Sequence, residues 1–232
     1  MHDRRVSRIV TPGTLIDENF MDPFSNNYVL AIHATQTLDV APVKTDHTSL
    51  IGLAWLDLST GHFFTQTTTL SALPSLLSRI GPKEVVLSEK FEAEKDHGIV
   101  TILEEEHYLV SYVNTTVIQS ISEWTTSLES PIPPGLIDQF TPEEVSAGSN
   151  LLQYVGTRLQ GSNIKLQPPT RQSDVMGIDK NTMRALEIKT TMREDSVSGS
   201  LLNVIRRTVT KGGTRLLGSW LSKLSLISNN SC

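Results

Sequence analysis

Residues 52–63 read GLAWLDLSTGHF, an apolar run that stops at a turn and is followed by a second run. Residues 51–58 are nearly all apolar, which is typical of a strand buried inside a sheet. Ser59, Thr60 and Gly61 supply turn chemistry, and residues 62–69 continue as a β-rich run. The stretch therefore predicts a β-hairpin around which the rest of a sheet must be built.

Patterns on both sides of the hairpin extend this sheet. The segment 39–48 is polar and contains a proline, so it predicts a loop before the hairpin, and Gly81-Pro82 ends a helix after it. The order β-β-β-α-β-α-β over residues 26–114 predicts an α/β fold: a mixed five-stranded sheet with helices on its faces, as in ribonuclease-H-like folds. The remaining predicted elements are strands at 28–34, 84–87 and 108–113 and helices over 73–80 and around 99–103.

The second half of the chain reads as helical. Residues 130–135, SPIPPG, predict a rigid connector, and Thr141-Pro142-Glu143-Glu144 has the signature of a capping box that begins a helix. Helical patterns return from residue 179 onward. The last predicted helix carries its apolar side chains on one face: Leu217, Trp220, Leu221 and Leu224. These helices have apolar faces with too few partners, so we expect part of this domain to be missing from the chain.

Composition excludes several classes of protein. The 232 residues carry 25 acidic and 20 basic side chains, a formal net charge of -5, which argues against autonomous binding to DNA phosphates. The one cysteine, Cys232, excludes a disulfide framework or a cysteine-based zinc site within one chain and favours a reducing, intracellular location. No apolar run approaches the roughly 18 residues that a membrane span requires.

Four strings in the chain are similar to motifs of the MutS family of DNA mismatch-repair proteins. They occur in family order and together cover nearly the whole chain, which makes the resemblance specific. The sequence around residues 20–28 is most similar to that of the fungal mitochondrial MutS homologue. The four strings are RIVTPGTLID at 8–17, GLAWLDLSTGHF at 52–63, MGIDKNTMRALEI at 176–188 and TVTKGGTRLLGSWL at 208–221.

The resemblance implies a division of the chain into three parts. Residues 1–24 correspond to a linker after the family's mismatch-recognition domain, 25–129 to its connector domain, and 130–232 to the start of an incomplete, all-α core or lever domain. The family's Phe-x-Glu mismatch wedge and its Gly-Lys-Ser/Thr phosphate loop do not occur in this sequence. The resemblance therefore assigns no catalytic, cofactor-binding or metal-binding residue here.

The same resemblance implies a non-catalytic piece of a larger machine. In the family, the full-length protein binds mismatched DNA, ATP and Mg²⁺ as a homodimer or heterodimer. The connector relays ATP-driven movement between the two ends and contacts a MutL-type partner. For this piece we expect DNA binding to be weak or absent, no membrane association, and a mitochondrial or nuclear location.

Two functions of other classes remain open from the residues alone. Asp57 closes a hairpin strand where ribonuclease-H nucleases place a metal-binding carboxylate, and Glu84 and Glu89 flank a later strand, so a two-metal nuclease is one alternative. Asp57 before Ser-Thr-Gly also suits simple turn chemistry. The other alternative is an α/β adaptor without a nucleic-acid role, in which residues 176–224 would fold stably alone.

The remaining charged side chains predict surface features rather than a site. His62, His97 and His107 are too scattered for metal-ligand spacing, and Glu104-Glu105-Glu106 reads as a solvated helix end. Two basic groups could face a nucleic acid or a partner, but a flexible start of the chain for the first group and helix solvation for the second are the favoured interpretations. These groups are Arg4, Arg5 and Arg8, and then Lys180, Arg184, Lys189 and Arg193, which are predicted to lie close to one helical face.

Overall fold

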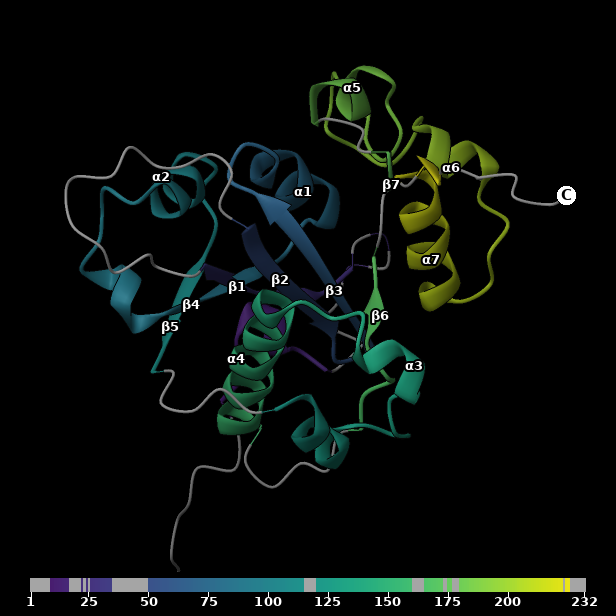
Figure 1. The fold of residues 1–232 in the computed structure, drawn as a ribbon. Helices are drawn as coiled ribbons and strands as arrows, with labels where there is room; N and C mark the ends of the chain where they lie inside the picture. The colour runs from purple at the N-terminus through teal and green to yellow at the C-terminus, as the bar shows by residue number, and fades with distance from the viewer. Residues whose placement is uncertain are drawn as a thin grey trace, which may run out of the picture.

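The computed structural model describes residues 9–16, 22, 24, 26–34, 50–114, 120–159, 165–172, 175–176, 180–222 and 224–225. A six-stranded mixed sheet with the order β5-β4-β1-β2-β3-β6 lies at its centre (Figure 1). Its strands are β1 Tyr28–Ala34, β2 Leu50–Asp57, β3 His62–Thr69, β4 Glu84–Ser88, β5 Val110–Val113 and β6 Thr170–Arg171.

The predicted hairpin supplies two adjacent inner strands of this sheet, β2 and β3. β2 pairs antiparallel with both β1 and β3, and Asp57 lies opposite His62 across the turn. Gly61 has φ 72, a left-handed conformation that glycine adopts without steric cost. β4 pairs parallel with β1, and β5 parallel with β4. All five predicted strands are therefore present, because their signals are local.

The sheet has one strand more than the sequence predicts. β6 pairs parallel with β3, with Thr170 opposite Phe64 and Arg171 opposite Thr65. Its two residues follow Pro168-Pro169 and carry no periodic pattern, so the sequence indicates only an extended segment there. The prediction of five strands is corrected to six.

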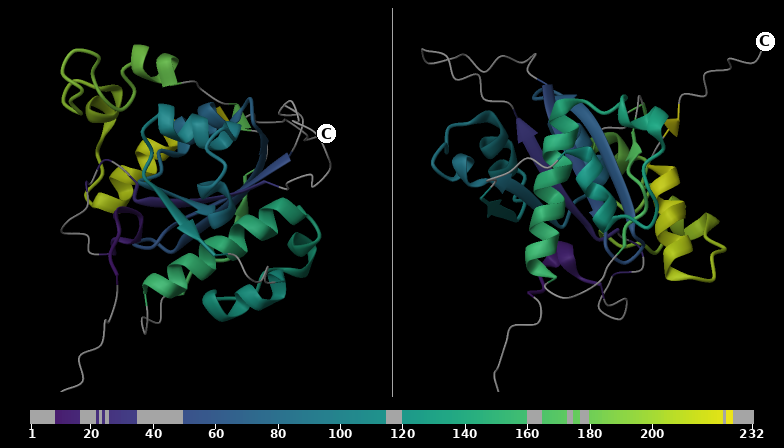
Figure 2. Two further views of the ribbon diagram at one scale, coloured as in Figure 1. Left: turned by 90° about the vertical axis from the view of Figure 1, so that its left-hand side faces the viewer. Right: turned by 60° about the horizontal axis from the view of Figure 1, so that its bottom comes forward.

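Two apolar cores lie on opposite faces of the sheet. Alternate residues of β1 divide between them: Val29 and Ala31 join one core, and Leu30 and Ile32 the other. The first core is covered by α4 Pro142–Arg158, and the second by α1 Leu73–Ile80 and α2 Gly98–Glu105 (Figure 2). Strands buried on both faces explain the continuous apolar runs in the sequence.

Helix α4 begins at the predicted capping box. Thr141 Oγ1 accepts the Glu144 N–H at 3.2 Å, and the Glu144 carboxylate accepts the Thr141 N–H at 2.9 Å. Gly52 of β2 allows the close approach of this helix, since a Cβ there would lie 2.0 Å from the Glu143 carbonyl oxygen. The sheet therefore covers the apolar face of α4, a helix that follows residue 130 in the sequence.

The C-terminal elements lie beside the β3 side of the sheet (Figure 1). They are β7 Val175–Met176, α5 Lys180–Ala185, α6 Leu201–Ile205, α7 Lys211–Leu221 and β8 Leu224–Ser225. The last predicted helix ends before Leu224, which belongs to β8. Its predicted apolar face is only partly buried: Leu217 and Leu221 are half-buried and Trp220 is 64% exposed, while Thr214, Arg215 and Gly218 are buried.

Short elements complete the described part of the chain. They are the 3-10 helices η1 Pro12–Thr14, η3 Glu89–Glu92 and η4 Ile121–Ser127 and the single helical turn α3 Pro134–Ile137. Trp124 of η4 is fully buried against α4, where its Nε1 donates to Ser149 Oγ at 3.2 Å. None of the helices in the described ranges is long and apolar enough to cross a membrane.

Candidate functional site

A cavity of about 310 Å³ lies between α7 and the hairpin end of the sheet. Its walls come from elements far apart in the sequence: β1 to β3 on one side, the segment before β6, and α7 on the other. This cavity is the point where the C-terminal elements meet the sheet. It is lined by Asn26, Tyr28, Asp57, Thr60, His62, Phe64, Gln167, Thr170, Gly212, Arg215, Leu216, Ser219 and Trp220.

Asp57, the residue proposed for a nuclease site, accepts hydrogen bonds within the hairpin turn that follows it. Its carboxylate is buried and accepts the Ser59 N–H at 2.9 Å, the Ser59 hydroxyl at 2.6 Å and the Asn27 N–H at 3.4 Å. These bonds fix the hairpin turn and join it to the residue that precedes β1. The interpretation of Asp57 as a turn-forming residue is therefore confirmed.

Tyr28 and Arg215 share the cavity with Asp57. Both side chains are buried, Tyr28 at 7% exposure on β1 and Arg215 at 3% on α7. Burial raises the pKa of Tyr28 well above its usual range, the negative charge of Asp57 raises it further, and the positive charge of Arg215 opposes the shift. The Tyr28 hydroxyl thus lies within the electrostatic reach of an acidic group on β2 and a basic group on α7.

A second cationic group lies nearby on α1. Arg79 is 5% exposed, its Nη2 donates to Gln66 Oε1 at 2.8 Å, and its buried Nη1 has no hydrogen-bond partner among the described residues. Burial lowers the pKa of this guanidinium. Arg79 borders a cavity of about 10 Å³, roughly the space of one water molecule, together with Tyr28 and with Ser219 and Ser222 at the α7 end.

A buried carboxylate ties the N-terminal turn to the opposite face of the sheet. Glu84 of β4 is fully buried and accepts hydrogen bonds from Thr11 Oγ1 at 2.5 Å, Gly13 N at 3.1 Å, Ser111 Oγ at 2.6 Å and the Tyr154 hydroxyl of α4. The segment expected to be a linker is thus anchored, because its turn donates two of these bonds.

The three carboxylates of the nuclease hypothesis do not converge. Glu84 points to the face that α4 covers, whereas Asp57 lies with Tyr28 at the opposite face. Glu89 is exposed in η3, beyond the other end of β4. Within the described ranges, no group of three or more His, Cys, Asp or Glu side chains could hold a metal ion. Two-metal chemistry needs such a cluster, so the described residues do not support the hypothesis.

The histidines lie apart, as their spacing indicates. His62 borders the large cavity, with its ring centroid 5.9 Å from that of Phe64. His97 caps α2 by accepting the Ile99 N–H at 3.2 Å, and burial lowers its pKa. His107 follows α2 with φ 57 and contacts the Glu104 carbonyl through Nδ1 at 2.9 Å. Two of the three therefore serve the ends of one helix.

The prediction that Lys180, Arg184, Lys189 and Arg193 lie close to one helical face is wrong. α5 ends at Ala185, and Glu187 with φ 48 prevents a helix from continuing to Lys189 and Arg193. Burial lowers the pKa of Lys189, and the nearby Lys83 lowers it further. The first group, Arg4, Arg5 and Arg8, and the cysteine, Cys232, lie outside the described residues.

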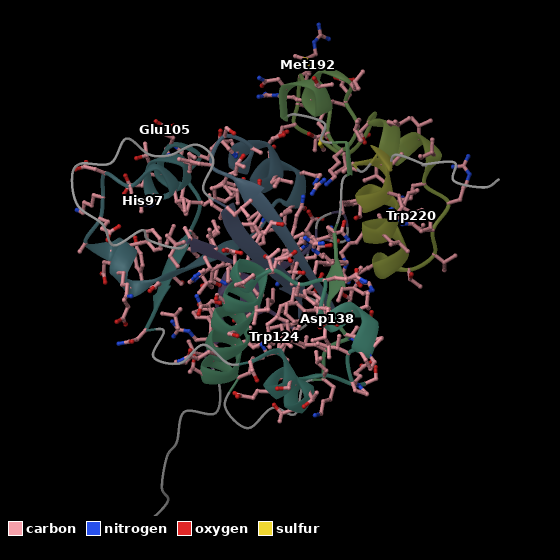
Figure 3. All side chains as sticks on the ribbon, in the orientation of Figure 1. His97, Glu105, Trp124, Asp138, Met192 and Trp220 are labelled. Carbon is pink, nitrogen blue, oxygen red and sulfur yellow. The ribbon has the colours of Figure 1, made fainter. Side chains whose placement is uncertain are left out.

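Large apolar side chains are exposed mainly on the C-terminal elements. Met192, near α5, projects at the side of the molecule far from the sheet, and Trp220 lies on the surface of α7 (Figure 3). A helix bundle that closed on itself would cover such side chains. The exposed set in this part is Leu186, Met192, Leu201, Val204, Ile205, Val209, Leu216 and Trp220.

Sequence reasoning missed the Glu84 network and the burial of Arg215. A signal existed for each: Glu84 is followed by three apolar residues of β4, and Arg215 follows Gly212, Gly213 and Thr214 in α7. A charged residue at a position that reads as buried must find partners, but the sequence does not say which ones.

Comparison with known proteins matches two successive family domains. MutS domain II matches residues 27–167, and MutS domain III matches residues 181–224. The DNA mismatch repair protein MutS of Wolbachia pipientis wMel is 36% identical over 227 residues, which cover 94% of this chain and 24% of that protein. The protein of the same name from Ehrlichia chaffeensis is 36% identical over 224 residues, which cover 94% of this chain and 26% of that protein. The one from Clostridium kluyveri is 29% identical over 224 residues, which cover 95% of this chain and 24% of that protein. The chain thus spans about a quarter of the length of these relatives.

Proposed function

This chain belongs to the MutS family, and from that premise we propose that it connects the mismatch-reading end of a DNA mismatch-repair protein to its ATP-hydrolysing end and relays movement between them. The observation that carries the proposal is that α7, within the domain III match, and the hairpin end of the domain II sheet line one cavity. Packed elements shift as units, so a movement of α7 reaches the sheet.

In this proposal residues 1–24 are the linker, 25–129 the connector and 130–232 the start of the lever domain. The packing of α4 on the sheet and the pairing of β6 with β3 support a connector that extends beyond residue 129. The strand order β3-β2-β1-β4-β5 supports a ribonuclease-H-like class for the connector. The apolar side chains exposed on α6 and α7 support an incomplete lever domain in the residues that follow.

We propose cofactors and partners for the full-length protein of which this chain would be a part. ATP, Mg²⁺ and mismatched DNA would bind elsewhere in that protein, which would act as a dimer. A MutL-type partner would contact the connector. We further propose a mitochondrial location, which the sequence of residues 20–28 supports. Fluorescence microscopy of a tagged full-length protein tests this location.

A domain-exchange experiment tests the relay. Residues 27–224 replace the matching segment of a bacterial MutS of about 36% identity, and the chimera is expressed in a strain that lacks MutS. We expect the mutation rate to fall toward the wild-type value and ATP to release the purified chimera from a mismatched duplex. The matching segment from a second bacterial MutS serves as the control exchange.

The result that contradicts the proposal is specific. If the chimera is folded, binds the mismatch and hydrolyses ATP, yet ATP no longer releases it from DNA while the control exchange is active, this segment does not relay movement. The nuclease alternative has a separate test: cleavage of labelled DNA by the 232-residue chain with Mg²⁺ that disappears in Asp57→Asn. We expect no such cleavage, because the carboxylates do not converge.

A further inference from the structure

We propose that Glu144 and Arg171 are the positioning residues that fix the point where the chain leaves the six-stranded sheet toward its C-terminal elements. Arg171 belongs to β6, which lies between the residues that match domain II, 27–167, and those that match domain III, 181–224. The role of this point in a relay rests on the proposed function, but the contact between the two residues does not.

The first step is that backbone pairing alone holds β6 weakly. The strand has two residues and is the last in the order of the sheet. Pro168-Pro169 precedes it and has no N–H to donate to β3. The Gln172 N–H, which follows the strand, donates to the Thr65 carbonyl at 2.8 Å. A strand this short gains little from its backbone hydrogen bonds, so a side-chain contact can decide whether it stays paired.

The second step is an ion pair between β6 and α4. Arg171 Nε lies 3.1 Å from each oxygen of the Glu144 carboxylate. The Glu144 side chain is 0% exposed and that of Arg171 is 33% exposed. A carboxylate without access to water needs donors and an opposite charge, which the Thr141 N–H and the Arg171 guanidinium supply. Movement of β6 away from α4 would remove the cation from a buried anion, which is unfavourable.

The third step is that Glu144 belongs to a firmly packed part of the molecule. It forms the capping box with Thr141 in the first turn of α4. This turn lies directly against β2, because a Cβ at Gly52 would be 2.0 Å from the Glu143 carbonyl oxygen. Arg171 is therefore held from two sides, by backbone pairing with β3 and by the first turn of α4.

The fourth step is the short path from β6 to α7. A few residues after Arg171, β7 pairs antiparallel with β8, which follows α7 in the sequence. The end of α7 is thereby tied to the segment that leaves the sheet at β6. Loss of the ion pair would therefore allow β7, β8 and α7 to change their position relative to the sheet.

A double-mutant cycle in the 232-residue chain tests the contact. The variants are Glu144→Gln, Arg171→Met and the double variant, and the measurement is hydrogen exchange of the Gln172 amide by NMR. Glutamine retains an acceptor for the Thr141 N–H, because a capping box forms with Glu or Gln. We expect each single variant to speed this exchange about tenfold, which corresponds to about 1.4 kcal/mol, and the double variant to add little to the larger single effect. Additive effects would overturn the inference.

A distance measurement separates positioning from local stability. Spin labels are attached at Glu105→Cys on α2 and Val209→Cys before α7, both exposed positions, in the background Cys232→Ser. We expect a narrow distribution of distances between the labels when the ion pair is intact and a broader one in Arg171→Met. If Arg171→Met speeds exchange of the Gln172 amide but leaves this distribution unchanged, the ion pair stabilises β6 without positioning the C-terminal elements, and the inference is overturned.

Matched controls separate the ion pair from the loss of a charge in general. Glu143→Gln removes an acidic charge from the same helical turn, and Arg193→Met removes an exposed arginine. Neither should change the Gln172 exchange or the distances between the labels. Effects as large as those of Glu144→Gln and Arg171→Met would contradict a specific role of the pair.

The conservative variant Arg171→Lys keeps the test usable if Arg171→Met does not unfold cooperatively in urea. Lysine retains the charge but not the planar fork, so it should restore part of the protection of the Gln172 amide and part of the narrow distance distribution. If lysine behaved as methionine does, the inference would fail. None of these measurements involves DNA, ATP or a partner, so failure of the domain exchange and failure of this contact are distinguishable.

Discussion

Glu84 shows how a single buried carboxylate can organise four segments of the chain. The N-terminal turn, β5 and α4 all donate hydrogen bonds to it, and no part of the side chain is exposed. The four donors replace the hydrogen bonds that this carboxylate would otherwise make to water. The Tyr154 hydroxyl is one of these donors, and burial together with this bond raises the pKa of Tyr154.

The substitution Glu84→Gln tests this organisation. An amide offers one acceptor oxygen and directs an NH₂ group at donors, so we expect the free energy of unfolding to fall by about 1–3 kcal/mol. Urea denaturation measures the loss. Glu105→Gln on the exposed side of α2 (Figure 3) is the matched control and should change stability by less than about 0.5 kcal/mol. Equal effects of the two substitutions would contradict the network.

His97 predicts a pH dependence of stability. Burial lowers its pKa in the folded state below the usual value of about 6.5, so the unfolded chain binds more protons at mildly acidic pH. Its contribution is therefore present above pH 6.5 and is lost as the pH falls below that value. Protonation of Nδ1 also removes the acceptor for the Ile99 N–H.

The variant His97→Asn keeps a capping side chain without the titration. We expect the loss of stability between pH 7.5 and pH 5.5, measured by urea denaturation, to be smaller in this variant than in the wild type. The pKa of His33 is also lowered by burial, but its contribution is common to both proteins and cancels in the comparison. An unchanged pH dependence would show that His97 does not contribute.

At the scale of secondary-structure elements, α4 contains two glycines whose replacement by alanine should change stability in opposite directions. A Cβ at Gly148 would lie 2.3 Å from the Trp124 ring, whereas nothing lies within 4 Å of the corresponding position at Gly156. Gly148→Ala should therefore destabilise the protein by about 1–3 kcal/mol through overpacking. Gly156→Ala should stabilise it by about 0.5–1 kcal/mol through helix propensity.

Thermal unfolding of the two variants measures this difference within one helix. Since both carry the same chemical change, their comparison removes the general effect of alanine for glycine. If Gly148→Ala were as stable as Gly156→Ala, α4 would not pack on η4 through Trp124 in the way described here.

At the scale of the whole molecule, the six-stranded sheet is covered on both faces while the C-terminal elements leave apolar side chains exposed. Exposed apolar clusters bind the dye ANS. We expect the 232-residue chain to increase ANS fluorescence, and the double variant Val204→Gln/Trp220→Gln to reduce this increase substantially with little change in stability. Both side chains are more than half exposed, so their removal leaves no cavity.

The control for this prediction is Leu50→Gln/Leu109→Gln, which removes exposed apolar side chains at the start of β2 and just before β5. ANS fluorescence should remain close to that of the unsubstituted chain. A reduction as large as that of the C-terminal variant would mean that the dye does not report on α6 and α7.

The sequence by itself determined the hairpin, the five main strands, the ends of α1 and the capping box of α4. Each depends on residues within a few positions of one another, such as Ser59 to Gly61 at the turn or Thr141 and Glu144 at the cap. Their hydrogen bonds form locally, so their pattern can be read along the chain.

Only the tertiary structure decided that α4 packs on one face of the sheet, that a sixth strand pairs with β3, and that α7 buries Arg215 rather than Trp220. It also separated Asp57 from Glu84 by placing them on opposite faces. The physical reason is that burial and charge compensation depend on partners distant in sequence. The same side chain can be solvated, paired or buried according to what the fold brings against it.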